Sequence, residues 1–253
     1  MKLTICAPNH SYLQPILANA SMYCAEHGHN FIEMSEKQCI DALYTGKADI
    51  ALINPLDFAL SKAQILIIPT FVVFAESYSG ISSIHFSKKS SSLETIGLES
   101  DDFLMNIGLI GLIEKYDVLM QKHIIQSNID KTTILEHYDS AILWNAESLI
   151  PGALDITEEW SDYNDFPLPI AFWACKDEDF TVDLLEITTH LAADDLPDIE
   201  TIKDSAEYEE EFGRIGSLLY HWKDDFKEHI MSIQQILYYH QMIPEIRDVH
   251  ILG

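Results

Sequence analysis

Hydrogen-bonding side chains follow the first predicted strand, and their types suit ligand binding or acid–base chemistry. An apolar strand over residues 2–7 leads into His10, Ser11 and Tyr12. A neutral imidazole can take a proton near pH 7, so His10 is the best candidate for a general acid or base. An ordinary surface histidine is the alternative. Ser11 and Tyr12 offer hydroxyl donors, although a serine before a helix also serves as a cap.

The sequence YTGKADIALINPLDF, over residues 44–58, reads as a helix end, a glycine stop, a strand and a polar loop. Gly46 suits the left-handed backbone that ends a helix, because it has no Cβ. Residues 48–53 are almost entirely apolar, as expected for a strand covered on both faces. Asn54 and Pro55 then stand at its carboxyl end, where open α/β sheets bind ligands. The same pair could also simply form the turn.

The middle of the chain supplies four more candidate ligand-binding residues. They stand at the ends of predicted strands or at a predicted helix start: Ser82, Ser83, Asp102 and Asn145. Each has an ordinary alternative, because Ser and Asn often occupy turns and an Asp at a helix N-terminus interacts favourably with the helix dipole. Ser100 is the expected cap of that helix, which should run to about Tyr116.

Composition excludes some classes of partner. The chain has 253 residues, of which 47% are hydrophobic, and a formal net charge of −26. Such a surface repels phosphate backbones and anionic lipids, so we expect neither nucleic acid nor membrane partners. The two arginines are Arg214 and Arg247. An acidic ligand would therefore be held by hydroxyls, backbone N–H groups and helix N-termini.

Cysteine usage and the N-terminal residues indicate a cytoplasmic protein. The start MKLTICAPNH enters a strand directly and shows no secretory signal, and no apolar run is long enough to span a membrane. Four cysteines lie on apolar segments without CxxC spacing: Cys6, Cys24, Cys39 and Cys175. We interpret them as buried free thiols in a reducing compartment. We find no zinc or phosphate-loop motif and expect neither a metal nor a cofactor.

The order of predicted elements indicates an α/β protein. Strands and helices alternate as far as the apolar strand 167–175, which could cross back into the first lobe. The chain should then turn helical, over 179–193 and again from Glu207 to about Met242, with a break at Gly213 or Gly216.

This order implies two lobes. The first is expected to contain residues 1–80 and 170–253, and the second residues 81–169. The candidate residues above would then line a central cleft between the lobes and hold a small molecule.

Five stretches occur in the order seen in one known family: GKADIALINPLDF, SGISSIHFSK, TIGLESDDFLMNIGLIGLIEKY, DSAILWNAESL and ALDITEEWSDYNDFPLPIAFWA. Together they resemble the chorismate dehydratase family of the futalosine route to menaquinone. The last stretch is the most specific, through Glu159, Trp160, Phe166, Pro167, Trp173 and Ala174. The resemblance implies the two-lobed fold of type II periplasmic binding proteins. It also implies a cytoplasmic lyase, free of metal and cofactor, that dehydrates chorismate to 3-enolpyruvylbenzoate.

The chain departs from this family at the expected site. The family's first loop carries Tyr-Leu-Asn, and its Asn aligns with Ser11, so the resemblance implies a catalytic or orienting role there. Where the family reads Ser-Arg-Thr-Ser, residues 102–105 read Asp-Phe-Leu-Met. The family's Ile-Gly-Asp becomes Trp-Asn-Ala at 144–146, while Ser83 or its neighbour Ser82 keeps a polar position.

Three functions stay open. The first is the lyase, favoured by the extent of the resemblance. The second is a diverged binding protein of the same fold without catalysis, whose ligand is neutral or cationic, favoured by the acidic and arginine-poor composition. The third is a structural paralogue whose cleft is closed by Phe103, Leu104 and Met105.

Overall fold

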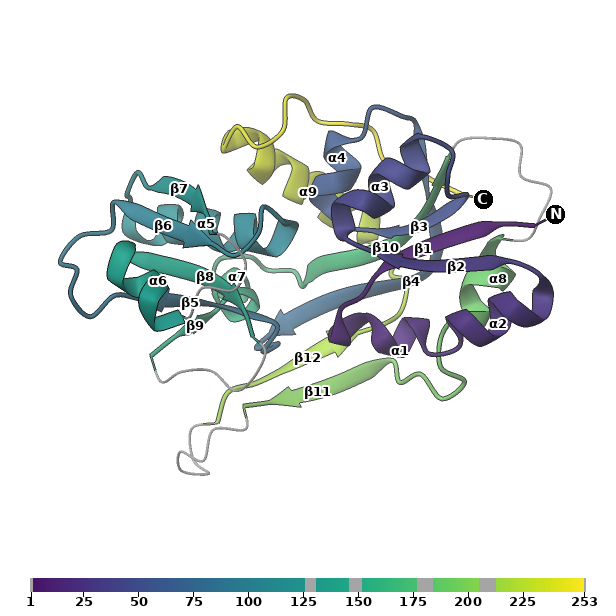
Figure 1. Cartoon of the computed structure of the whole chain (residues 1–253), viewed down its shortest axis with the longest axis horizontal. Coiled ribbons are helices and arrows are strands. Elements are labelled where there is room, and N and C mark those ends of the chain that lie inside the picture. Colours follow the sequence, from purple (N-terminus) through teal and green to yellow (C-terminus); the bar gives the residue numbers. More distant parts are fainter. Residues whose placement is uncertain (1, 126–130, 146–151, 177–183, 205–212, 253) are drawn as a thin grey trace. The chain divides into compact units, whose positions relative to one another are not determined.

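A computed structural model describes residues 2–125, 131–145, 152–176, 184–204 and 213–252 (Figure 1). The chain forms two compact α/β units and contains two sheets. Unit 1 contains Met1–Phe74, Pro169–Ile199 and Leu219–Gly253, and unit 2 contains Ala75–Leu168 and Glu200–Leu218.

Apart from residue 169, the predicted lobe boundaries differ from these units in two places. The first predicted segment continued to residue 80, whereas unit 2 begins at Ala75. The prediction also gave all of 170–253 to the first lobe, whereas Glu200–Leu218 belongs with unit 2.

Within the described residues, the larger sheet has eight strands in the order β11-β12-β4-β10-β3-β1-β2, with β13 beside β4. They are β1 (Thr4–Pro8), β2 (Asn30–Met34), β3 (Ile50–Ile53), β4 (Ile65–Ser77), β10 (Leu168–Lys176), β11 (Ile199–Lys203), β12 (Ile215–Leu219) and β13 (His250–Ile251). β1 is parallel to both β2 and β3. β10 is antiparallel to β3, with Trp173 opposite Leu52, so strand 167–175 does return to the first lobe's sheet as predicted.

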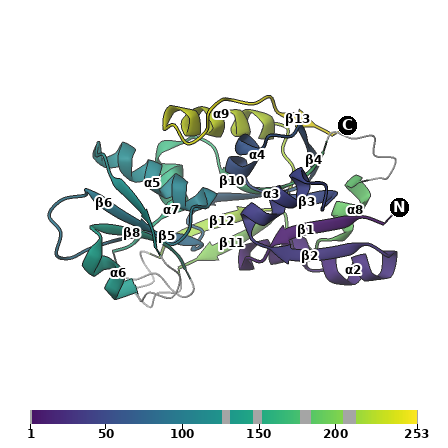
Figure 2. The same ribbon diagram turned by 45° about the horizontal axis from the view of Figure 1, so that its top comes forward.

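Helices cover this sheet in unit 1. They are η1 (Ser11–Leu13), α1 (Gln14–Leu17), α2 (Ala20–His27), α3 (Glu36–Tyr44), α4 (Pro55–Leu60), α8 (Leu184–His190) and α9 (Phe226–Tyr239). α3, α4 and α9 share one apolar cluster with the sheet, in which Phe226 of α9 packs on Phe172 of β10 at 5.3 Å between ring centroids. Figures 1 and 2 show α2 and α8 on the opposite face. β3 is therefore covered on both faces, which explains its continuous apolar sequence.

The prediction of a helix from Glu207 to Met242 is wrong over part of its length. Its start lies outside the described residues, but β12 occupies Ile215–Leu219 and α9 begins only at Phe226. Gly216 explains why a strand can pack here, because a Cβ on this residue would lie 2.1 Å from the backbone oxygen of Tyr78. Only glycine permits this close backbone approach. The start of the predicted helix 179–193 also lies outside the described residues.

Unit 2 contains a five-stranded sheet in the order β7-β6-β8-β5-β9, counted over the described residues. Its elements are β5 (Ser82–Phe86), β6 (Thr95–Leu98), α5 (Phe103–Tyr116), β7 (Gln121–Ile124), α6 (Lys131–His137), β8 (Ser140–Trp144), β9 (Leu154–Asp155) and α7 (Ile156–Tyr163). α5 packs closely on the sheet at Gly108, where an added Cβ would lie 3.0 Å from the Cδ1 of Ile142. On the other face, Ile134 of α6 packs on Leu143.

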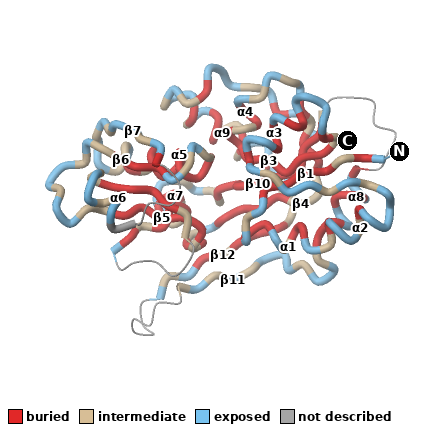
Figure 3. Tube along the Cα trace, in the orientation of Figure 1, coloured by how far each residue is buried: buried red, intermediate tan, exposed pale blue. Residues whose placement is uncertain are grey.

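Burial follows the sheets (Figure 3). The middle strands β3, β8 and β10 are almost fully buried, whereas the edge strands β2, β7 and β11 are largely exposed or half-buried. No helix in the described part of the chain is long and apolar enough to cross a membrane.

Candidate functional site

The polar residues of unit 1 gather at the carboxyl ends of β1 and β3. β1 leads into His10 and η1, and β3 leads into Asn54. Asn54 caps α4, because its Oδ1 accepts a hydrogen bond from the Asp57 N–H at 2.8 Å. Pro55 takes the first helical position, where its fixed φ and missing N–H suit a helix start. β1 and β3 are parallel neighbours, so both loops lie at one edge of the sheet.

Glu36 joins these two loops. It is the first residue of α3, whose N-terminus is fixed by a capping box. Its Oε2 accepts a hydrogen bond from Asn54 Nδ2 at 2.7 Å, and its Oε1 lies 3.3 Å from His10 Nε2. The same Asn54 Nδ2 donates to Asp57 Oδ2 at 2.8 Å. One amide group therefore bridges two carboxylates, and an imidazole faces one of them. We call these four residues the unit 1 cluster.

The three candidate residues of the first loop differ in burial and in their contacts. The ring of Tyr12 is buried and stacks on that of His10, with 5.2 Å between centroids. The side chain of His10 stays 26% exposed. Ser11 lies at the start of η1 and is exposed. The structure thus brings His10 and Asn54 together through Glu36, packs Tyr12 on His10, and leaves Ser11 at the surface.

Ser83 and Asn145 come together in unit 2. The Ser83 hydroxyl donates to Asn145 Oδ1 at 2.6 Å, and Asn145 Nδ2 donates to the carbonyl of Gly80 at 3.0 Å. His85 Nε2 lies 2.8 Å from Ser83 Oγ, so it can donate to the same hydroxyl. These residues, which we call the unit 2 cluster, contain neutral dipoles and an imidazole, whereas the unit 1 cluster contains two carboxylates.

The other two unit 2 candidates lie apart from this cluster. Ser82 points to the opposite face of β5, because successive strand residues alternate, and its hydroxyl is buried. Asp102 precedes α5 as its N-cap, and its carboxylate makes no capping hydrogen bond, so the prediction that Ser100 caps this helix is wrong. Phe103, Leu104 and Met105 are buried in the first turn of α5.

A third carboxylate, Asp155, is fully buried in unit 2 as the N-cap of α7. Its oxygens accept hydrogen bonds from the N–H groups of Ser79, Gly80, Thr157 and Glu158, and from the Thr157 hydroxyl at 2.7 Å. Burial raises the pKa of Asp155, and the hydrogen bonds from its neighbours oppose that shift. Because four of its five partners are backbone groups, we assign Asp155 a structural role.

Both arginines are engaged within the chain. Arg214 Nε lies 3.4 Å from Glu158 Oε2, and its Nη2 donates to the carbonyl of Ala153 at 2.9 Å. Arg247 donates to backbone carbonyls after α4, including that of Ala63 at 2.8 Å. The guanidinium groups therefore stabilise loops through bonds to carbonyl oxygens.

The cysteines are buried free thiols, as predicted. Burial raises the pKa of Cys24 to about 11, which keeps this thiol protonated and unreactive near neutral pH. Among the described residues, no group of three or more His, Cys, Asp or Glu side chains could hold a metal ion.

Sequence reasoning missed Glu36, Asp57 and His85. Glu36 directly follows the capping serine after a predicted strand, which is a usual position for ligand contacts in α/β sheets. Asp57 stands three residues after Asn54, at the position that a capping Asn contacts. His85 stands two residues after Ser83, so the two share one face of the strand.

Comparisons with known proteins show the fold alone. No family model matches the chain, and no curated protein matches its sequence. Among solved structures, the alkanesulfonate-binding protein SsuA from Xanthomonas axonopodis pv. citri, bound to MOPS, aligns with a TM-score of 0.62 and 10% identity, covering 98% of this chain and 96% of SsuA. Protein AF1704 from Archaeoglobus fulgidus aligns with a TM-score of 0.53 and 15% identity, over 73% of this chain and 71% of its own. The chain therefore has the two-lobed α/β fold of periplasmic binding proteins.

Proposed function

We propose that the protein binds a small molecule through the polar residues at its strand ends, and that this ligand offers hydrogen-bond donors or a positive charge. The unit 1 cluster carries this proposal. Two carboxylates lie close enough for one amide group, that of Asn54, to donate to both. A ligand amine or ammonium group could take the place of these donors, whereas a ligand carboxylate would be repelled.

One further observation supports a small polar ligand, and a second supports a ligand that is not anionic. The alkanesulfonate-binding protein SsuA, which has the same fold, is bound to MOPS, so the fold accommodates small polar molecules. In this chain both arginines are bound to backbone carbonyls. The expectation that candidate residues of the two lobes face one another across a cleft stays a prediction, and so does the cytoplasmic location.

A melting-temperature screen tests the proposal. Purified protein would be heated with a size-matched panel of primary amines, neutral amides and carboxylates. We expect amines or amides to raise the melting temperature, because a ligand that binds only the folded state stabilises it. The Glu36→Gln variant should lose this effect, and Glu26→Gln, which changes an exposed residue of α2, should keep it. Stabilisation by carboxylates alone would contradict the proposal.

A second candidate function is dehydration of chorismate, which the family resemblance implies. One observation favours it, namely the 3.3 Å approach of His10 Nε2 to the Glu36 carboxylate. A carboxylate in this position can orient an imidazole and stabilise its protonated form, as a general base requires. His10 would take a ring proton and pass it to the departing hydroxyl, which leaves as water, and the resemblance gives Ser11 an orienting role.

Mass spectrometry separates this candidate from simple binding. Purified protein incubated with chorismate should yield a product lighter by one water, above a heat-killed control. If the protein is the lyase, the His10→Ala variant should form none of this product, and the Glu26→Gln variant should still form it. An unchanged chorismate signal would exclude the lyase and leave the binding proposal to the melting-temperature screen.

A further inference from the structure

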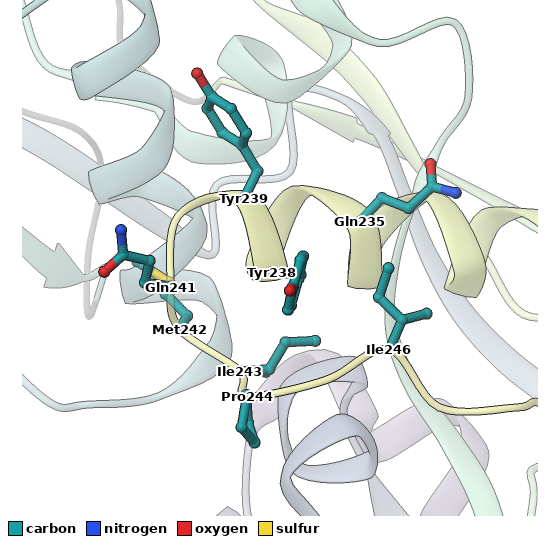
Figure 4. Close-up of a pocket in the computed structure, with 8 residues that line it drawn as sticks. All are labelled: Gln235, Tyr238, Tyr239, Gln241, Met242, Ile243, Pro244 and Ile246. Atoms are coloured by element: carbon teal, nitrogen blue, oxygen red, sulfur yellow. The ribbon is translucent and has the colours of Figure 1, made fainter.

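A groove outside the strand-end clusters lies at the carboxyl end of α9 in unit 1 (Figure 4). Its volume is about 860 Å³. Figure 4 shows Tyr238 between the helix and the segment that returns beneath it, with Ile243 and Ile246 on that segment. Met242 and Pro244 add further apolar surface to the lining. The groove shares no residue with the unit 1 cluster.

The turn that forms this groove is strained. Met242 N–H donates to the Leu237 carbonyl at 2.9 Å and Gln241 N–H donates to the Tyr238 carbonyl at 3.0 Å, which is a Schellman helix end. Such an end places one residue in the left-handed region, and glycine is usual there. Here Gln241 takes that position at φ 58°. Its side chain lines the groove, so the chain holds an amide at this wall despite an unfavourable backbone conformation.

The groove exposes aromatic and apolar side chains on a very acidic chain. Tyr239 is 77% exposed, Tyr238 51% and Ile246 40%. Exposed apolar patches of this kind mark interaction surfaces, and tyrosine is common among residues that dominate binding energy.

Negative charge adjoins the apolar groove. A smaller cavity of about 280 Å³ shares Ile246 with it and is lined in part by Glu245 and Asp248. The cavity also contains Arg247, whose guanidinium donates to the Ala63 carbonyl. The last turn of α9 carries no basic side chain, so the negative end of the helix dipole is not offset there.

We propose that this surface docks a segment of a partner protein that carries apolar side chains next to lysine or arginine. The apolar side chains would enter the groove at Tyr238 and Ile246, and the cationic group would meet Glu245 and Asp248. A second copy of this chain fits less well, because two chains of charge −26 repel one another.

Fluorescence polarisation with defined probes tests the proposal. The main probe is a labelled peptide of leucines flanked by lysines, and its two controls replace the leucines by serines or the lysines by glutamates. We expect saturable binding of the main probe alone, weakened by salt. Tyr238→Ser and Glu245→Lys should each weaken it by about tenfold. Tyr44→Ser, a matched exposed tyrosine at the end of α3, should not.

Gln241→Gly separates docking from folding. Glycine relieves the left-handed strain, so this variant should melt at a higher temperature and yet bind the main probe more weakly. Three results would overturn the proposal. They are equal binding of the serine control, equal binding by Tyr238→Ser, and a dimer of the wild-type chain that Tyr238→Ser abolishes.

Discussion

Glu36 in unit 1 and Asp155 in unit 2 are both buried carboxylates, but their partners differ. Glu36 contacts the side chains of Asn54 and His10. Asp155 accepts hydrogen bonds from four backbone N–H groups and one hydroxyl. Side chains can rotate to make room for a ligand group, whereas backbone N–H groups at a helix start cannot move without local unfolding. The comparison indicates a binding role for the first carboxylate and a structural role for the second.

Asp155→Ala should have the largest effect on stability. The change leaves the N–H groups of Ser79, Gly80 and Glu158 without their acceptor and removes the cap of α7. We expect a loss of about 3 kcal/mol, because buried donors without partners are strongly unfavourable. Urea unfolding measures it, with Asp155→Asn as a control that keeps one oxygen acceptor and should lose less. Equal stability of Asp155→Ala and the wild type would remove the structural role.

Ser83→Ala should come next. It removes the hydroxyl that donates to Asn145 Oδ1 and lies against His85 Nε2. Both of these groups in unit 2 therefore lose a hydrogen-bond partner. We expect a loss of about 2 kcal/mol in unfolding free energy. Ser87→Ala is a matched control, because the Ser87 hydroxyl contacts backbone groups: it donates to the Leu135 carbonyl and accepts from the Lys89 N–H. A smaller loss for Ser83→Ala than for Ser87→Ala would argue against a cooperative unit 2 cluster.

Asp139→Asn tests a second backbone-bound carboxylate in unit 2. Hydrogen bonds from the Ser90 hydroxyl and from Thr95 hold the pKa of Asp139 at about 2, below its ordinary value. A lowered folded-state pKa gives stability that is present above about pH 4 and is lost as the pH falls through about 2. Because the side chain is partly exposed, we expect only about 1 kcal/mol at neutral pH. Thermal unfolding of both proteins across this range should show the difference closing in acid, and a constant difference would contradict the assignment.

Glu36→Gln should have the smallest effect on stability. Glutamine keeps an oxygen that accepts from Asn54 and removes a charge that stands near Asp57. We expect a change within about 0.5 kcal/mol in thermal unfolding at neutral pH. A loss comparable to that of Asp155→Ala would make Glu36 a structural residue and remove the contrast between the two units.

More of the fold than of the candidate site could be predicted from the sequence. Residues 50–53 and 167–175 are continuous apolar runs, and such runs predict buried strands directly. β12 was missed because the contact that explains it joins residues far apart in the sequence: Gly216 fits against the backbone of Tyr78. The link from Glu36 to Asn54 likewise depends on the pairing of β1 with both β2 and β3, which places the loops after β2 and β3 at the same end of the sheet. Local patterns could identify Asn54 but not its partner.

The most direct test of the account is the affinity of one ligand for three proteins. Isothermal titration calorimetry would use the amine or amide that most raises the melting temperature, with the wild type, Glu36→Gln and Glu26→Gln. We expect Glu36→Gln to bind about tenfold or more weakly, because a charge-assisted hydrogen bond is lost, while Glu26→Gln binds as the wild type does. Equal affinity for all three proteins would contradict the claim that the unit 1 cluster holds the ligand.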